Sequence, residues 1–132
     1  MKRIILSILC CSIISIPAIA SMYDNFTPQQ KAMAQNEISF YQKLKTCTPA
    51  SHKADRYSLK INGLKNGNCE WVLSLGLSSD FDLKCSGPTS ATSQFADLKI
   101  EYLKDMYGLN PNSSFDSFNK IANDKYTDKY CK

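Results

Sequence analysis

Apolar residues recur at helical spacing in the first third of the chain. They follow Thr27-Pro28-Gln29-Gln30 and occupy Met33, Ala34, Ile38, Phe40, Tyr41 and Leu44. A threonine cap, a proline at the first helical position and a glutamine three residues after the cap are typical of a helix start. The pattern therefore predicts a helix from this start to about Lys45, ended by Cys47-Thr48-Pro49 and followed by a polar loop over residues 50–55.

Three stretches in the middle of the chain alternate between apolar and polar residues, which is the pattern of half-buried strands. They are 57–61, 69–75 and 81–85, and all three place apolar side chains at odd-numbered positions. The Asn66-Gly67 pair between the first two is the usual signature of a two-residue hairpin turn. Such a turn would set odd positions opposite even ones, and so apolar side chains opposite polar ones on one face. We therefore expect a loop of three or five residues there, within a three-stranded antiparallel meander.

Two further helices are predicted after Ser86-Gly87-Pro88, which we expect to end the sheet. The first begins near Ser93 and ends at Gly108, a natural C-terminal cap residue. Its apolar residues form one broad face: Phe95, Leu98, Ile100, Tyr102, Leu103 and Met106. The second opens at Ser113 or Ser114 and continues through Ala122. The chain thus reads as one α+β domain over residues 27–132, with an N-terminal helix, a three-stranded antiparallel β-meander and two C-terminal helices.

Residues 1–20 have the order of a cleavable secretory signal. Lys2 and Arg3 precede an apolar run that ends in Ala18-Ile19-Ala20, the spacing of small residues at a cleavage site. The run contains serines and Pro17 and is shorter than the roughly 20 apolar residues of a membrane anchor. We expect cleavage after Ala20, a flexible lead-in over residues 21–26, and a soluble mature chain that is secreted or periplasmic, with no stable membrane insertion.

Half of the net charge belongs to this signal. The whole chain has 16 basic and 12 acidic residues, for a net charge of +4, and the loss of Lys2 and Arg3 leaves +2. The remaining lysines are interspersed with acids, so there is no clustered basic face of the kind that binds nucleic acid or anionic membranes. The asparagine-glycine loop 62–68 lacks the lysine and the spacing of a phosphate-binding loop, and we expect no cofactor.

Cysteine chemistry follows from export. Cys10 and Cys11 leave with the signal, and four cysteines remain: Cys47, Cys69, Cys85 and Cys131. In a small exported domain, four cysteines without a Cys-x-x-Cys pair favour two disulfides over a zinc site.

Three pairings of these cysteines are possible, and strand parity favours one of them. If Phe81 lies opposite Leu73 in adjacent antiparallel strands, Cys69 and Cys85 lie directly opposite each other on one face. We therefore expect the bridges 69–85 and 47–131, the second of which would tie the end of the first helix to the C-terminus.

The tail contains a short repeat, Asp124-Lys125-Tyr126 and then Asp128-Lys129-Tyr130. On a helix the four-residue offset places Tyr126 beside Tyr130 and Lys125 beside Lys129. These four residues are the candidate contact strip for a partner. The alternative is a last helical turn that docks its tyrosines on the core and delivers Cys131 to Cys47. Trp71 shares its parity with Leu73, so we expect it in the core rather than as a carbohydrate-stacking platform.

The function expected from these features is a non-enzymatic binding or inhibitor module, whose partner is another protein or an envelope component. No Gly-x-Ser-x-Gly motif and no convergent catalytic set stands out. Two alternatives remain open: a small secreted hydrolase that uses Asp, Glu or Ser residues, and an envelope structural or assembly protein. A deep pocket joining an acid to an apolar floor would favour the enzyme, and a flat apolar or tyrosine-rich patch would favour the binding module.

Overall fold

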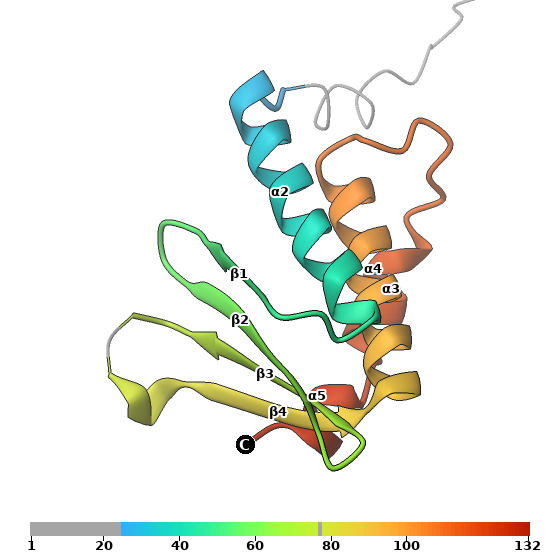
Figure 1. Cartoon of the computed structure of the whole chain (residues 1–132). Helices are drawn as coiled ribbons and strands as arrows, with labels where there is room; N and C mark the ends of the chain where they lie inside the picture. Colours follow the sequence, from blue (N-terminus) through green and yellow to red (C-terminus); the bar gives the residue numbers. More distant parts are fainter. Residues whose placement is uncertain (1–24, 77) are drawn as a thin grey trace, which may run out of the picture.

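The computed structural model describes residues 25–76 and 78–132, arranged as Figure 1 shows. The elements in chain order are α2 (Pro28–Lys45), β1 (Ala50–Lys53), β2 (Ser58–Lys65), β3 (Asn68–Ser74), the 3-10 turn η1 (Ser79–Phe81), β4 (Leu83–Pro88), α3 (Thr89–Met106), α4 (Asp116–Ala122) and α5 (Tyr126–Tyr130). The signal predicted for residues 1–20 lies outside the described residues, as do residues 21–24 of the predicted lead-in. Within the described part, no helix is long and apolar enough to cross a membrane.

The predicted α+β architecture is confirmed, with one more strand than expected. The sheet has four antiparallel strands in the order β1-β2-β3-β4. The additional strand, β1, occupies the stretch that the sequence predicts as a polar loop, and it pairs with β2 from Ala50 opposite Ile61 to Lys53 opposite Ser58. The sheet ends at Pro88, three residues after the end of the predicted strand, and α3 begins at Thr89 rather than near Ser93. Beyond the two predicted C-terminal helices, the tail forms the short helix α5.

The predicted start of the first helix is confirmed at the level of its hydrogen bonds. Thr27 Oγ1 accepts the backbone N–H of Gln30 at 3.1 Å, and Gln30 Oε1 accepts the backbone N–H of Thr27 at 2.9 Å. This reciprocal pair satisfies two amides that the first turn would otherwise leave without partners. At the end of α3, Gly108 has a φ of 65°, the left-handed conformation that favours glycine after a helix.

The β2–β3 connection corrects the expected loop length. Lys65 lies opposite Asn68, so the turn is the two-residue Asn66-Gly67 pair, with φ of 52° and 80°. Positive φ at both positions is characteristic of a type I′ hairpin. The parity conflict is resolved elsewhere, by a register shift between Ile61 and Gly63. This bulge accommodates one additional residue in β2 and brings Ile61 opposite Trp71, apolar against apolar.

The predicted disulfide pairing is wrong. The bridges join Cys47 to Cys69, with a Cα–Cα distance of 5.6 Å, and Cys85 to Cys131, with a Cα–Cα distance of 4.0 Å. The tail therefore delivers Cys131 to Cys85 at the sheet edge, and not to the end of the first helix.

The error lies in the register of β3 and β4, not in the face of the strands. The connection over residues 75–82 includes η1 and sets Leu83 opposite Leu73, whereas the predicted register has Phe81 at that place. Cys85 is consequently opposite Trp71 rather than opposite the cysteine of β3. A slip of two residues leaves every side chain on its original face, so alternation alone cannot distinguish the two registers.

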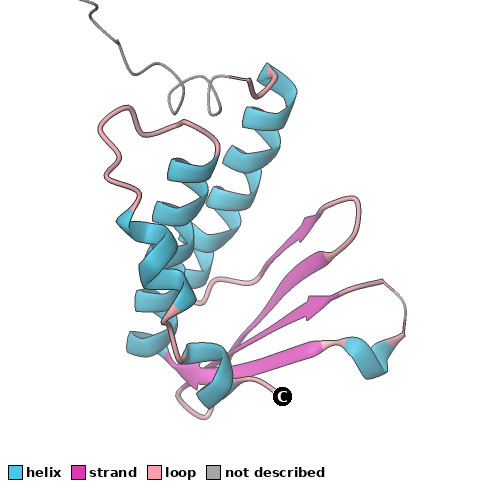
Figure 2. Ribbon diagram, turned by 180° about the vertical axis from the view of Figure 1, so that it is seen from behind, coloured by secondary structure: helices cyan, strands magenta, loops and turns pink. Residues whose placement is uncertain are grey.

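Helices α2 and α3 lie side by side and cover one face of the sheet, as Figures 1 and 2 show from opposite sides. The two layers meet at the end of the sheet where the Cys47–Cys69 bridge lies and where β4 leads into α3. They diverge toward the β1–β2 and β3–β4 connections. The largest fully buried side chains are Leu44, Leu59, Ile61, Thr92, Cys69 and Ser117.

The C-terminal residues cover the outer edge of β4. Cys131 pairs antiparallel with Cys85, and Lys84 and Lys132 exchange two backbone hydrogen bonds of 2.9 Å. The tail thereby occupies backbone groups that would otherwise be open at an edge strand.

Candidate ligand-binding cleft

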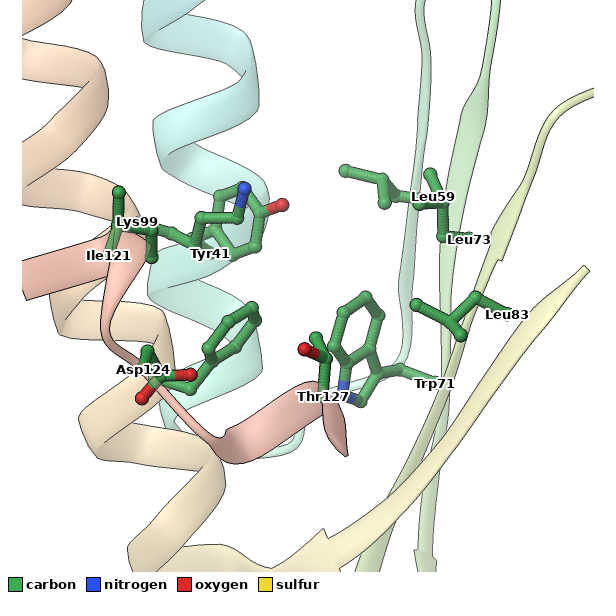
Figure 3. A pocket seen from close by; sticks show the side chains of 10 residues that line it. Tyr41, Leu59, Trp71, Leu73, Leu83, Lys99, Ile121, Asp124 and Thr127 are labelled. Carbon is green, nitrogen blue, oxygen red and sulfur yellow. The ribbon is translucent and has the colours of Figure 1, made fainter. Parts of the chain in front are cut away.

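A cavity of about 230 Å³ lies where the helix layer and the sheet diverge. Its lining comes from both layers and from the tail: Tyr41, Leu59, Trp71, Leu73, Leu83, Phe95, Lys99, Ile121, Asp124 and Thr127. In Figure 3 the three leucines and Trp71 of the strands lie on one side, and Tyr41, Lys99, Ile121 and Asp124 lie on the other. We call this cavity the cleft. Its walls are mostly apolar and carry one basic and one acidic side chain.

Lys99, the basic side chain of the cleft, projects from α3 among three aromatic rings. Its Nζ lies 5.8 Å from the ring centroid of Tyr102, 5.9 Å from that of Tyr41 and 6.0 Å from that of Phe95. Burial lowers the pKa of Lys99, and the negative charge of Glu37 works in the opposite direction. Among residues 25–76 and 78–132, no carboxylate oxygen lies within 4.0 Å of this Nζ. The ammonium is thus partly desolvated without an ion pair in this part of the chain.

Asp124, the acidic side chain of the cleft, is already engaged by the fold. Its Oδ2 accepts the backbone N–H of Tyr126 at 2.9 Å, at the start of α5. An aspartate that accepts the backbone N–H two residues further along forms an Asx turn, which stabilises the local backbone. The two charges of the cleft therefore differ. The carboxylate has a hydrogen-bond donor within the fold. Among the described residues, the ammonium has aromatic rings about 6 Å away but no hydrogen bond or ion pair.

Trp71 is held in the cleft wall by a buried hydrogen-bond network. Its indole Nε1 donates to the phenol oxygen of Tyr126 at 3.1 Å, and that oxygen lies 2.8 Å from Thr92 Oγ1. The Tyr126 ring also stacks on Phe95, with centroids 4.5 Å apart. The prediction that Trp71 packs in the core is confirmed, since only 3% of its surface is exposed.

A second hollow, of about 310 Å³, lies between the first half of α2 and the β1–β2 connection, and we call it the α2–β1 pocket. Glu37 is its central acid: Oε2 accepts the Tyr57 hydroxyl at 2.5 Å and lies 3.9 Å from His52 Nε2. The side chains of Glu37 and His52 are 14% and 13% exposed. A half-buried carboxylate beside an imidazole can exchange a proton with a bound molecule.

Two tyrosines near Glu37 are held in their neutral form. Burial raises the pKa of Tyr41 above its ordinary value, and the charge of Glu37 adds to the shift. For Tyr57, burial raises the pKa first, and the hydrogen bond to Glu37 raises it further. Both hydroxyls therefore remain protonated well above neutral pH. Among the described residues, no group of three or more His, Cys, Asp or Glu side chains could hold a metal ion.

The predicted contact strip of the tail is divided between core and surface. Tyr126 is 5% exposed and its hydroxyl belongs to the buried network, so it offers little surface to a partner. Tyr130 is half-buried, and Lys125 and Lys129 are exposed. All four line a shallow hollow of about 200 Å³, in which Lys129 Nζ lies 5.2 Å from the Tyr130 ring centroid. A partner contact through Tyr130, Lys125 and Lys129 stays a prediction.

Sequence reasoning missed Lys99 and Glu37, although both leave a signal in the helical pattern. Lys99 follows Phe95 by four residues and precedes Leu103 by four, so it lies on the face of α3 that carries those core side chains. Glu37 likewise precedes Tyr41, a core side chain of α2, by four residues. A charged residue at a core-facing helical position is the feature that could have identified both.

Comparison with known proteins identifies no relative: no family model, no curated protein and no solved structure matches this chain. The function is therefore argued from the geometry of the cleft.

Proposed function

We propose that this chain is an exported, disulfide-stabilised, non-enzymatic binding module that holds its ligand in the cleft between the helix layer and the sheet. The observation that carries this proposal is Lys99, a partly buried cation without an ion pair among the described residues, in a mostly apolar cleft. Ligand sites in proteins are typically concave and apolar, with a few polar groups that orient the ligand. Two disulfides support a secreted or periplasmic location, where the ligand is an envelope component or part of another protein.

The proposal is tested by capture on the mature chain, residues 21–132, with both disulfides intact. Leu83→Trp fills the cleft, since Leu83 lines it. Leu64→Trp is the matched control, because Leu64 is 62% exposed and lies outside the cleft lining. Molecules retained from the native envelope or medium are identified by mass spectrometry of both the protein and the lipid fractions. Retention by the parent and the control, but not by Leu83→Trp, supports the proposal. Equal retention by all three proteins contradicts it.

The second candidate is a small secreted hydrolase, and the observation that favours it is the Glu37–His52 pair of the α2–β1 pocket. The cleft itself also joins an acid to an apolar wall, but that acid, Asp124, already accepts a backbone N–H. Turnover of a peptide or glycan panel by the mature chain, abolished in Glu37→Gln and kept in Asp97→Asn, would establish the hydrolase. Asp97 is an exposed acid that pairs with Lys45 at 2.7 Å and serves as the matched control. Such turnover without any captured ligand would refute the binding module.

A further inference from the structure

We infer that the cleft binds a small carboxylate with an apolar body, its carboxylate beside Lys99 Nζ and its apolar body against the strand side of the cleft. The inference rests on the proposed binding function and names the chemical class of the ligand. It follows from the ammonium of Lys99, the apolar side chains on the strand side of the cleft, and the volume of the cleft.

The ammonium of Lys99 favours an anion at its end of the cleft. Lys99 Nζ has aromatic rings at 5.8 to 6.0 Å and no carboxylate within 4.0 Å among the described residues. The two nearby acids accept hydrogen bonds from other groups of the fold: Glu37 accepts the Tyr57 hydroxyl, and Asp124 accepts a backbone N–H. A partly desolvated cation gains most from a hydrogen-bonded anion, because charge-assisted hydrogen bonds are strongest where water is scarce.

The wall opposite Lys99 selects an apolar body. Figure 3 shows Leu59, Leu73, Leu83 and the Trp71 indole on the strand side of the cavity, across from the ammonium. The indole N–H is taken by Tyr126, so Trp71 offers its ring and not its donor. A ligand that spans the cleft therefore meets a cation at one end and hydrocarbon at the other.

The volume of the cleft limits the ligand to a small molecule or a single terminal residue. About 230 Å³ is below the range of roughly 300–1,000 Å³ that is usual for ligand pockets. A medium-chain fatty acid and the C-terminal residue of a peptide, with its α-carboxylate and an apolar side chain, share the required chemistry. The assay distinguishes these two sources.

The probes are octanoate, octanol, octylamine and a dipeptide, N-acetyl-Leu-Leu with a free or amidated C-terminus. Binding to the mature, disulfide-intact chain is followed by the fluorescence of Trp71, the only tryptophan of the sequence, and by calorimetry. We expect the carboxylates to bind at least about tenfold more tightly than octanol or the amidated dipeptide, and octylamine to bind least. Tighter binding of octanoate than of the free dipeptide identifies a fatty acid, and the reverse identifies a peptide terminus.

Two lysine variants of α3 make the assay specific to the cleft. Lys99→Met removes the charge and keeps most of the side-chain length, and we expect it to abolish the preference for carboxylates. Lys104→Met makes the same change at an exposed position of the same helix and should keep the preference. Urea midpoints of both variants show that they are folded.

The outcomes separate this inference from the function on which it rests. Equal binding of octanoate and octanol, or an unchanged preference in Lys99→Met, overturns the ligand class. If no probe binds while capture still depends on Leu83, the ligand class is wrong and the binding function stands. If no probe binds and capture is indifferent to Leu83→Trp, both are wrong.

Discussion

Replacing Cys85 and Cys131 together by alanine should lower the free energy of unfolding by about 4 kcal/mol. The bridge joins residues 46 positions apart, and the chain-entropy relation for a loop of that length gives about 4 kcal/mol at 25 °C. The same relation gives about 3.4 kcal/mol for the Cys47–Cys69 bridge, whose separation is 22. Since small domains have roughly 5–15 kcal/mol of stability in all, each bridge contributes a large share.

The assay is urea unfolding of residues 21–132, followed by Trp71 fluorescence, for three double variants. C47A/C69A and C85A/C131A each remove one bridge and leave no free thiol. C69A/C85A breaks both bridges and leaves two free thiols, and we expect it to be the least stable of the three. Were C69A/C85A instead to show no free thiol and the smallest loss, the pairing in the structure would be refuted. An unchanged midpoint in C85A/C131A would refute the loop-length argument itself.

Three further predictions concern the core. Tyr126→Phe leaves the indole N–H of Trp71 without its acceptor and should lower the free energy of unfolding by about 1–3 kcal/mol in urea titrations, whereas no loss would mean that the network is not formed. Burial raises the pKa of Tyr41 above its unfolded value of 10.0, so the contribution of the neutral phenol to folding stability is complete below pH 10 and is lost as the pH rises further. The urea midpoint should therefore fall less steeply above pH 10 in Tyr41→Phe than in the parent. Parallel pH profiles of the two proteins would contradict this. Asp105→Ala removes the acceptor of Ser117 Oγ from a buried site and should cost about 1–3 kcal/mol and speed amide exchange in α4, which a uniform change across the chain would contradict.

The sequence predicts elements of this fold where a local rule decides the outcome. The start of α2 depends on Thr27, Pro28 and Gln30 alone, and the prediction is confirmed. The inner face of the sheet depends on alternation, which placed Leu59 and Trp71 in the core correctly. Leu75 and Phe81 share that alternation but lie outside the strands, where they are 48% and 60% exposed, so their predicted burial is wrong.

Features that depend on register could not be read from the same alternation. Asn66-Gly67 is typical of a two-residue turn, but with regular strands such a turn would place apolar side chains opposite polar ones. A bulge between Ile61 and Gly63 adds one residue to β2, so that the two-residue turn forms and apolar residues still lie opposite apolar residues. The β3–β4 register differs from the expected one by two residues. Each side chain stays on the same face of the sheet, but Cys69 and Cys85 no longer lie opposite each other, and they pair with Cys47 and Cys131 instead.

The cleft was missed for a different reason. Its defining charge, Lys99, belongs to a chain whose lysines are mostly exposed and interspersed with acids, and composition does not distinguish it from them. Only its four-residue spacing from Phe95 and Leu103 distinguishes it. The cavity itself arises from the divergence of the helix layer from the sheet, and no local pattern encodes the angle between two layers.

The most direct test of the cleft as the binding site is an NMR titration of residues 21–132 with octanoate. Trp71 gives a single indole N–H resonance, because the chain has one tryptophan, and this group lies in the cleft wall in a hydrogen bond to Tyr126. We expect saturable shifts of that resonance and of the backbone amides of Leu59, Leu83 and Lys99. Shifts confined to the tail around Lys125 and Lys129, or no shifts at concentrations where calorimetry detects binding, would contradict the cleft as the site.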